Sequence, residues 1–163
     1  GVEAPIINFT GGTTSIVADI ETGENVPKDR YDCFVLPFTL HLAYDVKGAV
    51  RNCIETLRPG GVLLTCMTCR SWYPPDGFDL GDGQKGNVHW WFTPAGVRRT
   101  LREVGIPNDC VPLEVCGNRL AIIADIHGMP AEMFSSRELD HRDPMTPLLI
   151  CARIKRPPRA VNA

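Results

Sequence analysis

Apolar and polar positions alternate in blocks along the chain, in a pattern typical of an α/β protein. An apolar run at residues 31–36 is followed by a helical stretch after Asp45 and by a second apolar run at residues 62–67. Apolar residues of the helical stretch recur at offsets of 4, 7, 8 and 11 from its first residue, which places them on one face. A strand, a helix and a strand in this order predict a crossover unit of a parallel sheet, with a ligand-binding crevice just after Leu36.

Further elements are predicted on either side of this crossover unit. Thr93 and Pro94 have the residue types of a helix start, namely an N-cap and a proline in the first turn. The stretch 70–86 is rich in proline, glycine and aspartate, and we expect a lid or a substrate loop there. The remaining predicted elements are strands at 2–9, 15–19, 110–115 and 147–154, a buried helix at 118–127 and a short helical turn at 136–140.

The composition is that of an ordinary globular protein. Apolar residues make up 44% of the 163 residues, charged residues make up 22%, and the net charge is −2. This balance gives no basis for nucleic-acid binding through bulk charge, and no apolar stretch approaches the ~20 residues of a membrane span. Seven cysteines are an odd number for a disulfide scaffold, so we expect reduced thiols and a cytoplasmic protein. We expect a single domain over residues 1–156 and a tail at 157–163.

Five short motifs occur in an order that a known family shares. They are DCFVLPFTLHLAYD at 32–45, LRPGG at 57–61, WFTP at 91–94, GN at 117–118 and ELDHRDP at 138–144. In this order and spacing the chain resembles class I S-adenosylmethionine-dependent methyltransferases. More narrowly, it resembles a bacterial group whose fourth strand carries the segment DCiiLTQTLhxIYD. The resemblance covers nearly the whole chain.

The resemblance implies a Rossmann-like α/β sheet that is mostly parallel with one antiparallel strand. Residues 31–36 and 62–67 are then the fourth and fifth strands. In the family, the first strand ends in a glycine-rich G-x-G-x-G loop, where the backbone approaches the cofactor closely. This chain contains no G-x-G-x-G, so the resemblance implies a sheet that is incomplete at its N-terminal side. It also implies that the isolated chain binds the cofactor, S-adenosylmethionine, poorly.

The same resemblance implies cofactor contacts at the ends of two early strands. Asp19 matches the family position whose carboxylate accepts a hydrogen bond from the adenine amino group, and the backbone amide of Ile20 is its usual companion. Glu3 matches an acid that binds the ribose hydroxyls. The alternative role of Asp19 is that of a loop acid or a helix cap, and Glu3 is close enough to the terminus to fray.

The crevice after the fourth strand carries the other candidates. Family members line the methionine side of the cofactor and the substrate entry at the position of Leu36, Pro37 and Phe38. The family's Thr-Gln is replaced here by Pro37 and Phe38, which removes two polar groups. His41 is a candidate general base, because histidine titrates near neutrality, or alternatively a half-buried histidine that packs under the loop. Methyl transfer does not demand an acid–base pair, because a sulfonium is already a strong electrophile and alignment provides most of the acceleration.

The leading hypothesis is a methyltransferase domain that transfers a methyl group from S-adenosylmethionine to a small-molecule or sugar-type acceptor. We expect it to work with the remainder of a larger polypeptide or with a homodimer partner, and without nucleic acid, a membrane or a metal. A second hypothesis is a non-catalytic interaction module without a functional cofactor site, which the residues Pro37, Phe38 and Trp91 favour. A third is a thiol redox domain that uses Cys66 and Cys69.

Overall fold

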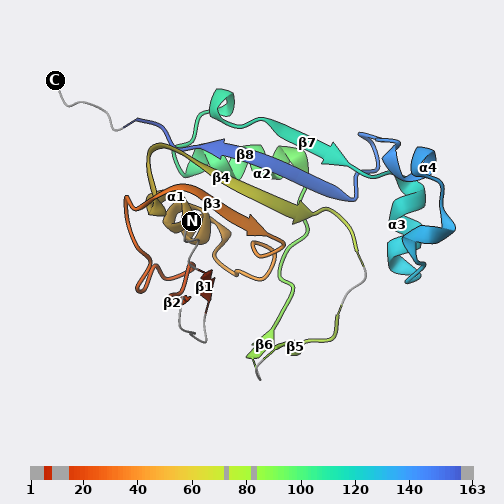
Figure 1. Ribbon diagram of the computed structural model, residues 1–163, viewed down its shortest axis with the longest axis horizontal. Coiled ribbons are helices and arrows are strands. Elements are labelled where there is room, and N and C mark those ends of the chain that lie inside the picture. The colour runs from red at the N-terminus through yellow and green to blue at the C-terminus, as the bar shows by residue number, and fades with distance from the viewer. Residues whose placement is uncertain (1–5, 9–14, 72–73, 82–83, 159–163) are drawn as a thin grey trace, which may run out of the picture.

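The computed structural model describes residues 6–8, 15–71, 74–81 and 84–158, and Figure 1 shows how their elements are arranged. The strands are β1 (Ile6–Asn8), β2 (Ser15–Val17), β3 (Tyr31–Pro37), β4 (Leu57–Thr68), β5 (Phe78–Gly81), β6 (Gln84–Gly86), β7 (Leu113–Cys116) and β8 (Leu149–Lys155). The helices are α1 (Val46–Thr56), α2 (Pro94–Glu103), α3 (Arg119–Ile126) and α4 (Ser136–Asp140), with short 3-10 helices η1 (Asn108–Cys110) and η2 (Ala131–Met133).

Among the described residues, four strands form the main sheet in the order β3-β4-β8-β7. β3 is parallel to β4, and β8 is antiparallel to both of its neighbours, β4 and β7. Three of these strands therefore run in one direction and β8 runs against them, which confirms an α/β sheet with one antiparallel strand; of the three pairings described, β3–β4 is parallel and the two that involve β8 are antiparallel. β1 and β2 form a separate parallel pair in the described part of the chain.

The two predicted helix starts are confirmed, and each is capped by the side chain that precedes it. The Asp45 carboxylate accepts a hydrogen bond from the Gly48 amide at 3.0 Å, and the Thr93 hydroxyl accepts one from the Gly96 amide at 3.1 Å. Such bonds satisfy amides that the first helical turn leaves unpaired, and each stabilises its helix by about 1 kcal/mol. α1 is followed directly by β4, which begins earlier than the predicted strand at 62–67.

The core lies between the main sheet and the helices α1 and α2, which lie behind the sheet in Figure 1. Alternate residues of β4 and β8 point into this core, as the two-residue period of a strand requires. The opposite face of the sheet carries apolar side chains that stay exposed, with Val35 at 61% and Leu64 at 39%. The side chains that are almost completely buried include Ala49, Cys53, Leu57, Leu63, Ile150 and Ile154.

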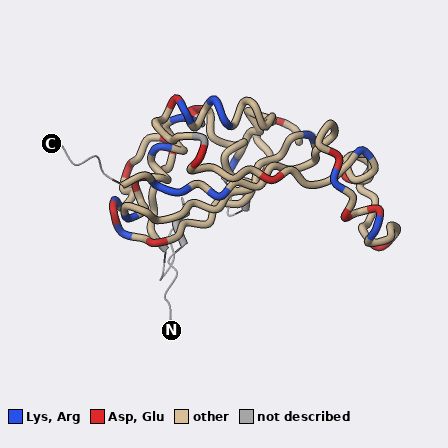
Figure 2. Tube along the Cα trace, turned by 90° about the horizontal axis from the view of Figure 1, so that it is seen from above, with Lys and Arg blue, Asp and Glu red and all other residues tan. Residues whose placement is uncertain are grey.

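α3, η2 and α4 form a lobe beyond one end of the main sheet. We call residues 118–146 the distal lobe, and it projects from the sheet in both overall views (Figures 1 and 2). The helix predicted at 118–127 is confirmed as α3, but the prediction that it is buried is wrong. Ile123 and Ile126 are 45% and 51% exposed, because a helix in a projecting lobe is covered on only part of its circumference.

Two other predictions differ from the structure. The stretch 70–86, expected to be a loop, contains the antiparallel hairpin of β5 and β6. The strand predicted at 110–115 begins later, as β7, because the chain first forms a 3-10 turn and Pro112 has no amide to donate to a sheet. No helix among the described residues is long and apolar enough to cross a membrane.

Candidate functional site

A cavity of about 440 Å³ opens where β2 ends and where the chain turns after β3. Ligands of α/β sheets bind at the carboxyl ends of strands, and this volume is within the usual range for small-molecule sites. One wall comes from residues 19–21 and a second from Thr39 and residues 42–43. Residues 85–87 and His89, in and after β6, form the third wall.

Asp19 reaches this cavity from the loop that follows β2. Its Oδ1 accepts a hydrogen bond from the Glu21 amide at 2.7 Å and a longer one from the Thr22 amide at 3.4 Å. This local turn fixes the orientation of the carboxylate, as is usual for aspartate in loops. Within the described residues no hydrogen bond reaches Oδ2, so this oxygen can accept one from a ligand in the cavity.

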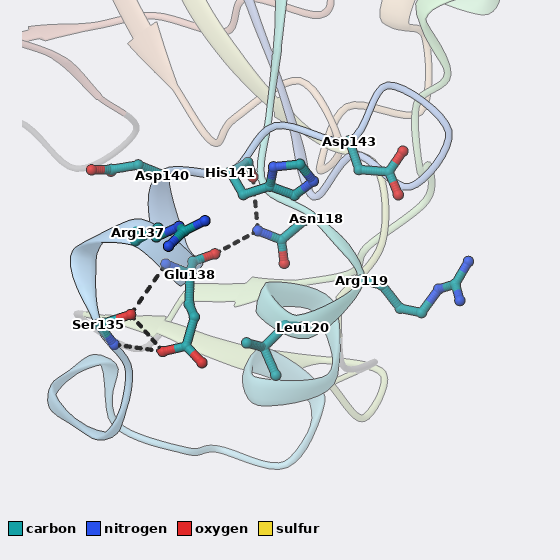
Figure 3. Close-up of a pocket in the computed structure, with 9 residues that line it drawn as sticks. All are labelled: Asn118, Arg119, Leu120, Ser135, Arg137, Glu138, Asp140, His141 and Asp143. Atoms are coloured by element: carbon teal, nitrogen blue, oxygen red, sulfur yellow. Dashed lines mark hydrogen bonds between the residues drawn. The ribbon is translucent and has the colours of Figure 1, made fainter.

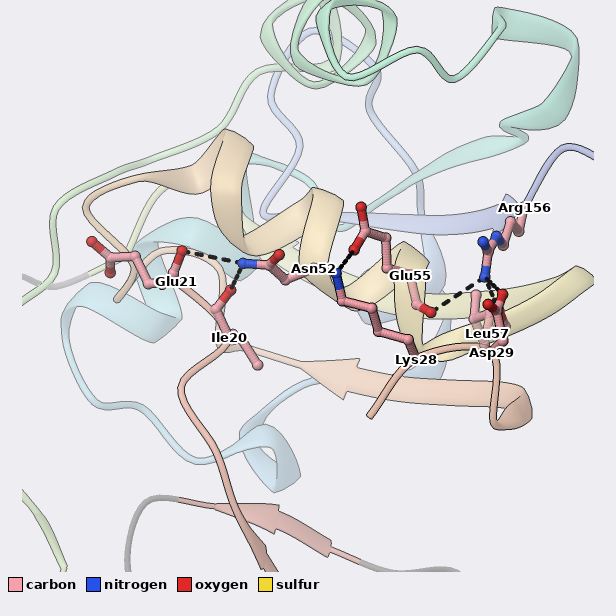
Figure 4. A network of polar contacts seen from close by, with 8 residues as sticks. All are labelled: Ile20, Glu21, Lys28, Asp29, Asn52, Glu55, Leu57 and Arg156. Carbon is pink, nitrogen blue, oxygen red and sulfur yellow. Dashed lines mark hydrogen bonds and ion pairs between the residues drawn. The ribbon is translucent and has the colours of Figure 1, made fainter. Parts of the chain in front are cut away.

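Figure 4 shows how α1 holds the loop after β2 in place. The Asn52 Nδ2 donates hydrogen bonds to the carbonyls of Ile20, at 2.9 Å, and Glu21, at 3.2 Å. In return, the Glu21 carboxylate accepts bonds from the amides of Tyr44, at 3.0 Å, and Asp45, at 3.1 Å. This wall of the cavity is therefore attached to a core helix at both the start and the middle of that helix.

A second polar cluster in Figure 4 lies at the other end of α1. The Arg156 guanidinium donates to the Asp29 carboxylate at 2.7 Å and to the carbonyls of Glu55 and Leu57. The Lys28 ammonium pairs with the Glu55 carboxylate at 2.8 Å. Because the Arg156 side chain is only 14% exposed, this cluster fastens the end of β8 to the junction of α1 and β4. We assign it a structural role.

Leu36 and Pro37 end β3 and Phe38 follows it, and these residues do not line this cavity. The Leu36 side chain is buried in the core, and its carbonyl accepts a hydrogen bond from the Thr65 hydroxyl at 2.8 Å. The Phe38 amide donates to the Cys66 carbonyl at 3.0 Å, and its backbone is left-handed with φ 46°. That conformation is uncommon outside glycine, and the Phe38 side chain is 49% exposed. A role for these residues in cofactor binding stays a prediction.

Two histidines lie near the cavity in different settings. His41 does not line it, and its carbonyl accepts a hydrogen bond from the His89 amide at 2.8 Å. Burial lowers the pKa of His41, and its Nδ1 is enclosed without a partner in the described part of the chain. His89 lines the cavity, and its ring stands edge-on to that of Tyr44 with centroids 5.5 Å apart. Burial therefore favours the neutral form of His41, and its role as a general base stays a prediction.

Sequence reasoning named Asp19 and Ile20 of the first wall but missed the residues of the second and third walls. Lys85, Asn87 and His89 belong to the stretch expected to be a lid or to the segment just after it. Asn87 also closes the hairpin, because its Oδ1 accepts a hydrogen bond from the Gly77 amide at 2.6 Å. The available signal was the polar pair Lys85 and Asn87 followed by a histidine shortly before the helix start at Thr93.

Two of the motifs meet in the distal lobe, as Figure 3 shows. Asn118 is 5% exposed, and its Nδ2 donates to the carbonyls of Glu138, at 2.8 Å, and His141, at 2.7 Å. Its Oδ1 accepts a hydrogen bond from the Ala121 amide at 3.0 Å. One side chain therefore caps α3 and holds α4, whose own start carries a capping box of Ser135 and Glu138. We call this set of hydrogen bonds from Asn118 to Ala121, Glu138 and His141 the clasp. The residues around it border an open hollow of about 1090 Å³.

The thiols of Cys66 and Cys69 do not face each other. Cys66 lies on the open face of β4, whereas Cys69, just beyond the strand, is buried on the core side with Met67. Burial raises the pKa of Cys69 to about 11, so it is a poor thiolate at neutral pH. Their placement on opposite faces argues against the redox hypothesis built on this pair.

Two further expectations concern metals and the ribose contact. No group of three or more His, Cys, Asp or Glu side chains that could hold a metal occurs among the described residues. Glu3, expected to bind the ribose hydroxyls, lies outside the described residues. The structure therefore says nothing about that contact.

No protein-family model matches the chain, and no curated protein matches it. Solved structures do match over most of its length. An S-adenosylmethionine-dependent methyltransferase from Mesorhizobium loti is 20% identical with a TM-score of 0.51, over 90% of this chain and 72% of that one. The 1,6-didemethyltoxoflavin-N1-methyltransferase from Burkholderia thailandensis, with bound 1,6-didemethyltoxoflavin and S-adenosylhomocysteine, is 10% identical with a TM-score of 0.52, over 93% of this chain and 60% of that one.

At these identities the likeness is one of fold. The chain has the fold of class I S-adenosylmethionine-dependent methyltransferases, which confirms the fold that the sequence motifs imply. In the order β3-β4-β8-β7, the neighbouring parallel strands β3 and β4 are the fourth and fifth strands expected from the resemblance. The cavity next to Asp19 thus lies at the end of the sheet that binds ligands in α/β folds.

Proposed function

We propose that this chain carries the adenosine-binding part of a methyltransferase, which transfers a methyl group from S-adenosylmethionine to a small-molecule or sugar-type acceptor. The observation that carries the proposal is the cavity after β2, where one oxygen of Asp19 is held by its own turn and the other is free to accept a hydrogen bond. The fold supports the same function, and one structure of that fold contains S-adenosylhomocysteine with a small-molecule ligand.

The residues around the cavity are suited to an adenine ring. In the proposal, the Asp19 Oδ2 accepts a hydrogen bond from the exocyclic amino group, and the Ile20 amide donates to a ring nitrogen. Leu42 and Ala43 supply apolar surface beside the ring. An adenine presents a donor next to an acceptor, so a carboxylate oxygen beside a backbone amide forms a matching pair.

The other candidate residues belong to the chemical end of the site. We propose that Pro37 and Phe38 border the methionine side of the cofactor and the acceptor, and that Glu3 binds the ribose. The bound cofactor supplies an already activated methyl group, so the chain needs to orient the two reactants and exclude water. Burial lowers the pKa of His41 and so favours its neutral form, which in the proposal accepts a proton from an acceptor hydroxyl.

The test is binding of S-adenosylhomocysteine measured by ligand-observed NMR, which detects weak complexes. Weak binding is expected because the chain has no G-x-G-x-G loop. The variant Asp19→Ala removes the proposed acceptor, and we expect affinity to fall roughly ten- to a hundredfold, as for loss of a hydrogen bond to a charged group. The matched control is Asp32→Ala, because that carboxylate is exposed and pairs with Arg58 at the start of β3, away from the cavity.

The outcomes separate the two remaining hypotheses. Binding that Asp19→Ala abolishes and Asp32→Ala preserves supports the methyltransferase. Absence of binding by the unaltered chain, or equal binding by both variants, contradicts the proposed adenosine site and favours the non-catalytic interaction module.

A further inference from the structure

We propose that Cys66 and Cys151 form a reversible cross-strand disulfide when the protein meets a peroxide. The two residues are direct partners in the antiparallel register of β4 and β8, and their Sγ atoms lie 3.2 Å apart. Directly opposed residues of antiparallel strands have Cα atoms about 4.5–5.5 Å apart, which is within the range of about 4.4–6.8 Å that a disulfide spans. The bond can therefore form without moving either strand.

The register also distinguishes this pair from the other nearby thiol. Cys116 of β7 is within hydrogen-bonding reach of Cys151, but it is paired in the sheet with Leu149. Cys116 and Cys151 are therefore diagonal neighbours, whose Cα atoms are typically about 7–8 Å apart. That separation exceeds the disulfide range, so oxidation is directed to Cys66.

A small oxidant can reach the pair on the open face of the sheet. Cys66 and Cys151 are only partly buried, and they border a shallow apolar hollow of about 360 Å³ together with Val35 and Leu64. Burial and the neighbouring Cys66 thiol raise the pKa of Cys151. The thiolate is the nucleophile, and either residue can supply it; we take Cys66 as the residue that attacks first.

The reaction balances with hydrogen peroxide as the oxidant. The Cys66 thiolate attacks one peroxide oxygen, the O–O bond breaks, and the products are a sulfenic acid and hydroxide. The Cys151 thiol then attacks the sulfenic sulfur, the S–S bond forms, and water leaves. In total, two thiols lose two protons and two electrons, and one peroxide becomes two waters. A dithiol reductant reverses the change by thiol–disulfide exchange.

The disulfide would affect the turn after β3 through a backbone hydrogen bond of Cys66. The Cys66 carbonyl accepts the hydrogen bond from the Phe38 amide, at 3.0 Å. Oxidation would therefore fix the strand that supports this turn to its antiparallel neighbour, whether or not the proposed cofactor function is correct.

The test is peptide mapping after brief treatment of the reduced protein with hydrogen peroxide. Free thiols are alkylated and the protein is digested with trypsin without reduction. Trypsin does not cut before Pro59, so Cys66 lies in peptide 52–70 and Cys151 lies in peptide 143–153. We expect these peptides to be linked, with a mass two hydrogens below their sum, and dithiothreitol to separate them. Fragmentation assigns the sulfur atoms.

Matched variants make the result specific. Cys66→Ser should abolish the linked peptide, whereas Cys69→Ser and Cys116→Ser should leave it unchanged. A link that persists in Cys66→Ser, or oxidation of the exposed Cys33 while Cys66 and Cys151 remain reduced, overturns the proposal. Circular dichroism of each reduced variant shows that loss of the link does not reflect loss of the fold.

Discussion

Replacement of Asn118 by alanine should release α4 from the distal lobe. The side chain is 5% exposed and makes three hydrogen bonds, one to the Ala121 amide and two to the carbonyls of Glu138 and His141. Alanine removes the cap of α3 and leaves both carbonyls without their donor. α4 has five residues and is too short to form a stable helix alone.

The size of the effect follows from these three bonds. Loss of an N-cap asparagine costs about 1 kcal/mol. Each carbonyl that loses a buried donor costs about 1–3 kcal/mol, with the lower end applying here because Glu138 and His141 are exposed residues that water can reach. The expected loss is therefore about 3 kcal/mol, which corresponds to a rise of roughly a hundredfold in the open population of the lobe.

Hydrogen exchange of peptides from the lobe, read by mass spectrometry, measures this opening. Asn118→Ala should speed exchange in both α3 and α4. Asn118→Asp keeps the acceptor for Ala121 but cannot donate to the two carbonyls, so it should speed exchange in α4 and leave α3 protected. Ser135→Ala removes only the capping box and should affect α4 alone, by about 1 kcal/mol. Unchanged exchange in residues 136–141 of Asn118→Ala would refute the clasp.

Two further predictions concern stability. Gly117 has φ 87°, and a Cβ there would lie 2.7 Å from the Leu148 Cβ, whereas Gly128 has φ 62° with open space around it. In thermal unfolding, Gly117→Ala should therefore cost about 2–4 kcal/mol and Gly128→Ala about 1–2 kcal/mol, and equal shifts would contradict the steric argument. Hydrogen bonds from Lys47 and a neighbouring arginine lower the pKa of Glu103 to about 2. Because the folded pKa is below the ordinary value of about 4.3, this link stabilises the fold above that value and is lost as pH falls toward 2. Glu103→Gln should flatten that part of the pH–stability curve, and an unchanged acid branch would contradict this assignment.

The elements that the sequence predicted correctly are those with local signals. α1 follows an aspartate cap and has one apolar face, and α2 follows a threonine cap with proline in its first turn. The early start of β4 was not predictable in this way. Leu57 pairs with Tyr31 and Val62 pairs with Cys33 across the parallel ladder, with an irregularity between them, so the early start of β4 depends on a strand more than twenty residues earlier. The exposure of Ile123 likewise depends on how the whole lobe projects.

The same distinction applies to the candidate site. Asp19 and Ile20 were predictable because their position at the end of a strand implies the mouth of a crevice, and the structure brings both into one cavity. Lys85 and His89 were not, because only the folded hairpin brings them opposite Asp19. The role of Asn118 was also hidden, since a motif match does not distinguish a side chain that binds a ligand from one that joins two helices.

The turn after β3 explains why the cavity is displaced from the crevice expected just after Leu36. β4 occupies the backbone groups of that turn, since the Thr65 hydroxyl binds the Leu36 carbonyl and the Cys66 carbonyl binds the Phe38 amide. A ligand there finds only the side chains of Pro37 and Phe38, which offer no hydrogen-bonding group. Polar recognition is therefore left to the walls of the cavity, among them the loop after β2, where the Asp19 carboxylate keeps one oxygen free. We therefore predict that replacing Asp19 lowers the affinity for an adenosine-type ligand more than replacing either Pro37 or Phe38.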